Sequence, residues 1–294
     1  MANYSIRDLE RLTGIKAHTI RIWEKRYGLI DPERTSTNIR AYCDSDLKKL
    51  LNISILNKNG FKISKIAQLS TNEIADNINK LTEHSSDSES LIENLTITMI
   101  DLNESRFEKI LSRAIIQLGF EDTVIRILNP FLIRIGIMWQ TGSINPAQEH
   151  FVSYLIRQKM LVAIDSQITD NHPGAKTFVL FLPEGEMHEM SLLFASYLIR
   201  KRGHKVIYLG QSIPLNDLIE IGKKCQPDYF LASFITTMAD CDVFNYLINL
   251  SGKFPGKTIY VTGNQALGLK DDLPAITRFI GSPPELISTL EPLV

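Results

Sequence analysis

The chain has 294 residues, of which 44% are apolar, so it is long enough for two or three domains with their own cores. No apolar run reaches the roughly 20 residues that span a bilayer, and the first residues lack the basic and then apolar layout of a secretory signal. We therefore expect a cytoplasmic protein that does not contact membranes. Its cysteines, Cys43, Cys225 and Cys241, are expected to be reduced thiols.

Charge is distributed unevenly along the chain. Residues 1–69 contain 13 Lys and Arg against 7 Asp and Glu, a net charge of +6. The remaining residues carry a net charge of −7. A basic segment on an acidic body predicts that the first segment binds a polyanion.

The first 70 residues, which we call the head, are expected to be mostly helical. The expected helices are Ile6–Thr13, Ala17–Tyr27, Ser45–Asn59 and Ile63–Leu69. Ser5 and Asp44 are suited to cap the first and third helices, and a glycine follows each of the first three. The polar stretch Leu29–Cys43 predicts a loop or a small β-hairpin.

The first two helices have the spacing of a helix-turn-helix, in which the second helix enters the major groove of DNA. Ile20, Trp23 and Tyr27 lie near one face of the second helix and are expected to pack inward. Donors on the other face and in the following stretch are suited to base edges and phosphates. The expected DNA contacts are His18, Arg21, Lys25, Arg26, Arg34, Thr35, Asn38, Arg40 and Tyr42.

The string IRIWEKRYGLIDPERTSTNIRAY resembles the MerR family of transcription regulators, over residues 4–70. The resemblance implies a winged helix-turn-helix in which Arg21, Arg34 and Arg40 contact duplex DNA. Trp23 and Tyr27 are then expected to shape the fold only. Because one small head reaches few bases, a homo-oligomer, dimer or tetramer, is expected to read paired half-sites of an operator.

Two further segments follow the head. Residues 71–90 are polar and predict a linker with one short helical piece. In residues 91–170 the apolar residues recur at three- and four-residue steps. Breaks near residues 102–105, 119–120 and 141–146 delimit four helices, which favours an antiparallel four-helix bundle.

Residues 175–294 change period and predict five strands that alternate with helices. The expected strands are Phe178–Pro183, Lys205–Gly210, Asp228–Phe234, Thr258–Gly263 and Ile276–Gly281. Repeated strand–helix units indicate a doubly wound, flavodoxin-like parallel sheet covered on both faces. Such sheets bind ligands at the carboxyl ends of their strands. The fold class is therefore multidomain, α and α/β.

The stretch after the first of these strands contains Glu186 and His188. A neutral imidazole that a carboxylate orients is a good ligand for a metal such as cobalt. His204, which follows Gly203, is expected to be solvated, so that its replacement has little effect.

Glu186-Met187-His188-Glu189-Met190-Ser191, followed by Ser233 and later by Gly263-Asn264, resembles the cobalamin-binding module of methionine synthase and its relatives. The resemblance implies that His188 is the lower axial ligand of cobalt, and that Ser233 and Gly263 line a slot for the nucleotide tail. Two departures narrow this slot, because Ser191 and Asn264 stand where the family has glycine. A relic domain that has lost its ligand therefore remains an alternative.

Trp139, nine intervening residues and Glu149-His150 resemble the signature of cobalamin-dependent MerR-type photoreceptors. The resemblance implies that these three side chains line the pocket of the upper axial group. Those photoreceptors have His directly after the Trp, whereas this chain has Gln140, and an amide is a poorer cobalt ligand. No stable bis-histidine photoproduct is therefore expected. His150 is the nearby residue that could take the place of the missing histidine.

Together these features predict a DNA-binding transcription regulator, a repressor and not an enzyme, whose activity adenosylcobalamin or methylcobalamin controls. The resemblance to photoreceptors also implies a response to light. One alternative is a MerR-type regulator whose sensor no longer binds cobalamin and serves as an oligomerisation or protein-binding scaffold. The other is a corrinoid carrier or enzyme, which the DNA-binding head disfavours.

Overall fold

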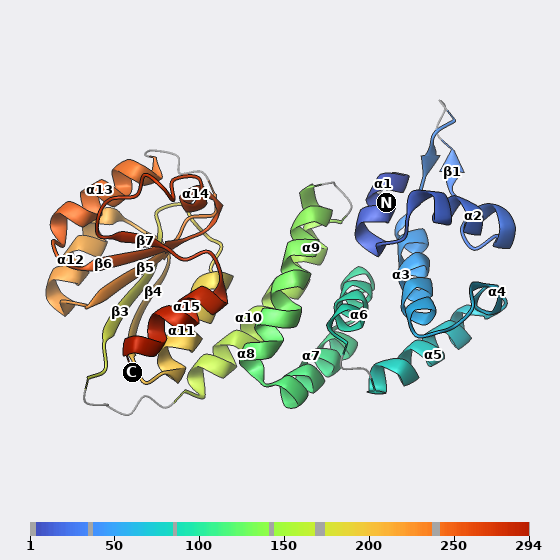
Figure 1. The fold of residues 1–294 in the computed structure, drawn as a ribbon, viewed down its shortest axis with the longest axis horizontal. Coiled ribbons are helices and arrows are strands. Elements are labelled where there is room, and N and C mark those ends of the chain that lie inside the picture. Colours follow the sequence, from blue (N-terminus) through green and yellow to red (C-terminus); the bar gives the residue numbers. More distant parts are fainter. Residues whose placement is uncertain are drawn as a thin grey trace. The chain divides into compact units, whose positions relative to one another are not determined.

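A computed structural model of the chain describes residues 4–34, 38–84, 87–140, 144–167, 174–236 and 242–293, except for the side chains of residues 75, 79–84 and 140. These residues form two compact units, Met1–Leu155 and Ile156–Val294, which are coloured from blue to green and from green to red in Figure 1. Among the described helices, none is long and apolar enough to cross a membrane.

The head has the predicted helix-turn-helix and a short hairpin. Its elements are α1 (Ile6–Thr13), α2 (Ala17–Tyr27), β1 (Glu33–Arg34), β2 (Arg40–Ala41), α3 (Asp44–Lys58) and α4 (Ile63–Ile66), with β1 and β2 antiparallel. Ser5 caps α1 by accepting a hydrogen bond from the Asp8 amide at 3.3 Å. Gly14 and Gly28 end α1 and α2 in left-handed conformations, at φ of 70° and 60°. The predicted bounds of both helices are confirmed.

The N-terminus of α3 differs from the prediction. The N-cap residue is Cys43, whose amide donates to the Asp46 carboxylate at 3.0 Å, and Asp44 lies inside the helix. The Asp44 carboxylate instead accepts a hydrogen bond from the Tyr4 hydroxyl at 2.7 Å. Tyr4 also forms an isolated β-bridge with Tyr42, so this corner of the head closes on the start of the chain.

The segment after the head contains the four helices predicted for residues 91–170, but the predicted linker of residues 71–90 holds a further 14-residue helix, Thr71–His84, whose Ile74 and Ile78 are buried. Its elements are α5 (Thr71–His84), α6 (Ser88–Ile100), α7 (Glu104–Leu118), α8 (Phe120–Thr123), a π-helical turn η1 (Val124–Leu128), α9 (Asn129–Gln140) and α10 (Pro146–Asp165). α8, the π turn and α9 follow one another without a break and form the third of the four helices after α5. The π turn was not predicted.

Helix α6 is buried on all sides. It packs against α3 of the head and against α7, η1 and α9. Its Glu93 is completely buried in the contact with α3. The Glu93 carboxylate accepts hydrogen bonds from Lys58 Nζ at 3.0 Å and from Ser54 Oγ at 3.3 Å. A carboxylate without access to water requires such partners.

The second unit contains a five-stranded sheet of parallel strands. The strands are β3 (Thr177–Pro183), β4 (Lys205–Ile213), β5 (Tyr229–Ser233), β6 (Thr258–Thr262) and β7 (Thr277–Phe279), in the order β4-β3-β5-β6-β7. The helices are α11 (Met190–Lys201), α12 (Leu215–Cys225), α13 (Val243–Lys253), α14 (Asn264–Leu267) and α15 (Pro283–Leu290), with a final 3-10 turn η2 (Glu291–Leu293). This strand order is that of flavodoxin-like folds, which confirms the prediction.

Helices cover both faces of the sheet (Figure 1). Val179 and Phe181 point to the face that α12 and α13 cover, and the alternate residues of β3 point to the face of α11. The chain reverses its direction of growth between β3 and β5, so their carboxyl ends form the topological switch point where such folds bind ligands. The stretches after β3 and β5 therefore hold the candidate site of this unit.

Candidate functional site

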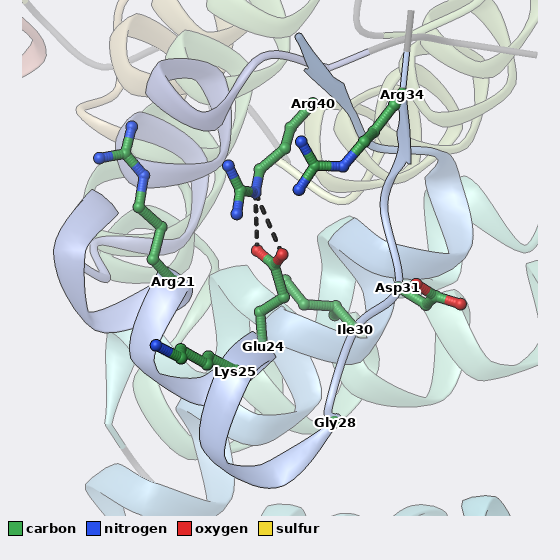
Figure 2. A pocket seen from close by; sticks show the side chains of 8 residues that line it. All are labelled: Arg21, Glu24, Lys25, Gly28, Ile30, Asp31, Arg34 and Arg40. Atoms are coloured by element: carbon green, nitrogen blue, oxygen red, sulfur yellow. Dashed lines mark hydrogen bonds and ion pairs between the residues drawn. The ribbon is translucent and has the colours of Figure 1, made fainter. Parts of the chain in front are cut away.

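The exposed side of α2 and the hairpin form a basic surface on the head. His18, Arg21, Lys25 and Arg26 are all exposed on α2, as predicted. Arg21 and Lys25 line a hollow of about 630 Å³ together with residues of both strands (Figure 2). The complete lining is Arg21, Glu24, Lys25, Gly28, Ile30, Asp31, Arg34 and Arg40.

Arg40 is held at the centre of this hollow by Glu24. Its Nε lies 3.1 and 3.0 Å from the two oxygens of the Glu24 carboxylate, drawn as dashed lines in Figure 2. Among the described residues, the two terminal nitrogens of Arg40 have no hydrogen-bond partner, so they remain able to donate to a phosphate. The pair fixes the hairpin to α2, and the sequence did not indicate this role of Glu24.

The hairpin carries the other predicted DNA contacts. Arg34 is exposed and donates from Nη1 to the Asn38 side chain at 2.7 Å. Asn38 adopts a left-handed conformation, with φ of 62°, which is tolerated by asparagine. Thr35 lies outside the described residues.

Tyr42 requires a correction. It was expected to donate a hydrogen bond to DNA, but the structure buries it completely, and burial raises the pKa of its hydroxyl. It belongs to the core of the head with Ile20 and Trp23, which are buried as predicted. Tyr27 is half-buried, and the Arg26 guanidinium lies 5.4 Å from the centre of its ring.

Trp139 lies near the end of α9, and Glu149 and His150 lie near the start of α10. Trp139 is one residue from the end of α9 and has 57% of its surface exposed, which is unusual for a tryptophan. Glu149 accepts from Ser153 Oγ at 2.6 Å and lies 2.9 Å from Nδ1 of the exposed His150 ring. The described contacts include none that joins Trp139 to this pair. The side chain of Gln140 lies outside the described residues.

In the second unit, the loop after β3 presents His188 to solvent. The His188 side chain is 60% exposed, and its Nδ1 lies 2.7 Å from Oε1 of Glu186, which is only 2% exposed. Because an ionised carboxylate can only accept, Nδ1 carries a proton, and in the neutral tautomer with that proton the lone pair is on Nε2. The predicted orientation of His188 by Glu186 is therefore present.

Glu186 also joins the loops after β3 and β5. Oε1 accepts from the amides of Met187 and His188, both at 2.9 Å. Oε2 accepts from the amides of Ile235 and Thr236, at 2.9 and 2.7 Å, and from the Thr236 hydroxyl at 3.0 Å. Burial alone raises the pKa of Glu186, but these hydrogen bonds outweigh it and lower the pKa to about 2. Thr236 was missed in the sequence, because only the fold brings it to Glu186.

The predicted slot residues have structural partners of their own. Ser233 is completely buried and lies 3.1 Å from the hydroxyl of the exposed Ser191. Gly263 has φ of 100°, and a Cβ at this position would lie 2.2 Å from the carbonyl oxygen of Phe234. The loop after β5 thus requires glycine here whether or not a ligand binds. Asn264 is exposed at the start of α14.

His204 also requires a correction, since it is only 2% exposed. Its Nδ1 accepts from the Lys176 amide at 3.3 Å, and its ring packs on Phe178 with the ring centres 5.8 Å apart. It is a core residue of the α/β domain. His188, in contrast, is exposed, and because its Nδ1 is hydrogen-bonded to Glu186, Nε2 is the ring nitrogen that could ligate a metal.

Comparison with known proteins agrees with these two sites. Residues 4–73 match the family of MerR HTH regulatory proteins, and residues 91–163 match a B12 binding domain. One segment of the chain is thus similar to MerR-type regulators and the next is similar to B12 binding domains. The B12 match covers the helices that carry Trp139, Glu149 and His150.

Two relatives are similar to this chain over most of its length. The HTH-type transcriptional repressor CarH of Myxococcus xanthus is 28% identical over 90% of this chain and 89% of its own. The repressor CarA of the same organism is 26% identical over 92% and 89%. The monomethylamine corrinoid protein of Methanosarcina barkeri is similar in fold, with a TM-score of 0.59, 11% identity, and coverage of 71% of this chain and 100% of that one.

Proposed function

We propose that this protein is a transcriptional repressor whose MerR-type head binds duplex DNA and whose B12 binding module controls that binding. The observation that carries the sensor half is His188, an exposed imidazole whose proton position is set by a buried carboxylate. When bound, cobalamin would supply a cobalt ion, for which an imidazole nitrogen is a suitable ligand. His188 would provide that nitrogen, and Glu186 would fix its tautomer.

The other predicted residues take supporting roles in this proposal. As the resemblance implies, Trp139, Glu149 and His150 would contact the adenosyl or methyl group. Ser191, Ser233, Gly263 and Asn264 would line the slot for the nucleotide tail. Occupancy favours one oligomeric state, and the number of heads in that state sets the affinity for the operator, because linked heads bind with a high effective concentration.

The test of the sensor is absorbance of the purified full-length protein after addition of adenosylcobalamin in the dark. We expect a spectrum of histidine-ligated cobalamin that His188→Ala loses. Glu184→Gln, which changes an exposed residue of the same loop, should retain it. If the wild type binds no cobalamin, the scaffold alternative replaces this proposal. Wild-type affinity and spectrum in His188→Ala would exclude His188 as the ligand.

The test of the head is DNA affinity as a function of salt. Arg21→Ala should weaken operator binding and lower the slope of log K against log salt by about 1, because one phosphate contact is lost. Lys205→Ala removes an exposed positive charge of the α/β domain and should change neither quantity. A binding-site selection that enriches no sequence for the wild type would contradict the proposed function of the head.

A further inference from the structure

Next to His188, the loop after β3 has a second buried carboxylate. Glu189 directly follows His188 and stands at the N-cap position of α11, yet its side chain makes no capping hydrogen bond. The side chain is only 8% exposed. A buried carboxylate without partners is strongly disfavoured. The side chains that pair with Glu189 therefore indicate its function.

Two side chains from distant elements pair with Glu189. Arg157, on α10, places Nε 2.5 Å from Oε1, and Tyr208, on β4, donates its hydroxyl to Oε2 at 3.0 Å. Burial and the Glu189 charge raise the pKa of Tyr208, so its hydroxyl stays protonated and remains a donor. Both carboxylate oxygens are therefore engaged, each by a different element.

β4 contributes a third set of contacts to the same loop. Ser212 Oγ accepts from the Gly185 amide at 3.1 Å, and the Gln211 side chain donates to the Met187 carbonyl at 2.7 Å. These contacts, those of Glu186 and those of Glu189 fix the backbone on both sides of His188, whose ring is 60% exposed. A loop held on both sides of one exposed side chain orients that side chain.

We propose that Arg157 is a positioning residue. Together with Tyr208 it holds Glu189, and thereby the backbone of His188, so that the His188 ring can ligate the cobalt of cobalamin. This inference rests on the proposed function. Arg157 acts through Glu189, the residue after His188, and its effect is to restrict the loop so that little ordering of the His188 ring is required when cobalamin binds. Outer partners of metal ligands typically change affinity by about 10- to 100-fold when removed.

The test uses full-length protein with Arg157→Met, which keeps the aliphatic stem and removes the donor. We expect the dissociation constant for adenosylcobalamin to rise about tenfold, and the fraction of bound cobalamin with a histidine ligand to fall. Arg157→Lys should recover part of both, because it restores the charge but not the Nε geometry. Gln158→Met changes the exposed neighbour on the same helix and should behave as wild type.

A second readout does not involve cobalamin. In the apo protein, Arg157→Met and the milder Tyr208→Phe should each speed hydrogen exchange of the amides in residues 187–193, and Gln158→Met should not. If Arg157→Met fails to fold, Tyr208→Phe carries the test. Unchanged exchange and unchanged affinity in the folded variants would overturn the positioning role.

Failure of this inference is distinguishable from failure of the proposed function. If His188→Ala loses the histidine-ligated spectrum while Arg157→Met keeps wild-type affinity and spectrum, only the positioning role is wrong. If His188→Ala itself behaves as wild type, the ligand assignment is wrong and the positioning role falls with it.

Discussion

Replacing Glu186 by Gln tests how the two loops at the switch point are held together. The Glu186 carboxylate accepts from four amides, and glutamine would present an NH₂ group to one pair of them. Two donors would then face each other. The hydrogen bonds lower the pKa of Glu186 from 4.5 to about 2, and each pKa unit corresponds to about 1.4 kcal/mol. Loss of the charge should therefore cost the two loops about 3 kcal/mol.

The assay is hydrogen exchange of the Ile235 and Thr236 amides in the apo protein. A cost of about 3 kcal/mol corresponds to roughly hundredfold faster exchange, if these amides exchange by opening of the loops. Glu184→Gln is the control, because Glu184 is exposed in the same loop. Exchange in Glu186→Gln within a factor of about three of the wild type would refute the reasoning, since the carboxylate would then contribute less than about 1 kcal/mol.

Two further replacements test the fold around the sites. Gly263→Ala should destabilise the apo α/β domain by about 3 kcal/mol, because φ of 100° and the contact with Phe234 both oppose a Cβ. The control Gly252→Ala, in open space on α13, should leave stability unchanged. If Gly263→Ala lowered cobalamin affinity without lowering the melting temperature, the structural role of Gly263 would be contradicted. Burial raises the pKa of Glu93 despite Lys58, so its contribution to stability is present below its ordinary pKa of 4.5 and is lost as the pH rises through the folded value. In Glu93→Gln the free energy of unfolding, measured by urea titration followed by tryptophan fluorescence, should no longer fall over this pH range. An unchanged pH profile would show that Glu93 is not the group responsible.

The parts of the fold that depend on local chemistry could be predicted from the sequence. The bounds of α1 and α2 follow from Ser5, Gly14 and Gly28, whose effects act within one helical turn. The sequence assigned the N-cap of α3 to Asp44, because aspartate is among the preferred N-cap residues. The error arose because Tyr4, forty positions earlier in the chain, takes its carboxylate.

The candidate sites show the same division. Glu186 and His188 are two residues apart, so their hydrogen bond could be expected from the sequence. Thr236 and Arg157 reach the same loop through β5 and α10, and no spacing rule indicates such contacts. His204 was misassigned for the same reason, since Gly203 before it suggested a turn, whereas the packing on Phe178 buries it.

The two described histidines of the α/β domain show why His188 is better explained as a ligand than as a structural residue. His204 is buried, packs on a ring and accepts a backbone hydrogen bond, which is what a histidine that stabilises a core does. His188 is 60% exposed and contributes little packing, yet two buried carboxylates, Glu186 and Glu189, flank it. Burying a carboxylate lowers stability unless its partners compensate. Donors from α10, β4 and the loop after β5 thus hold the backbone around an exposed ring that itself contributes little packing, and the proposed role of His188 as a cobalt ligand accounts for this arrangement.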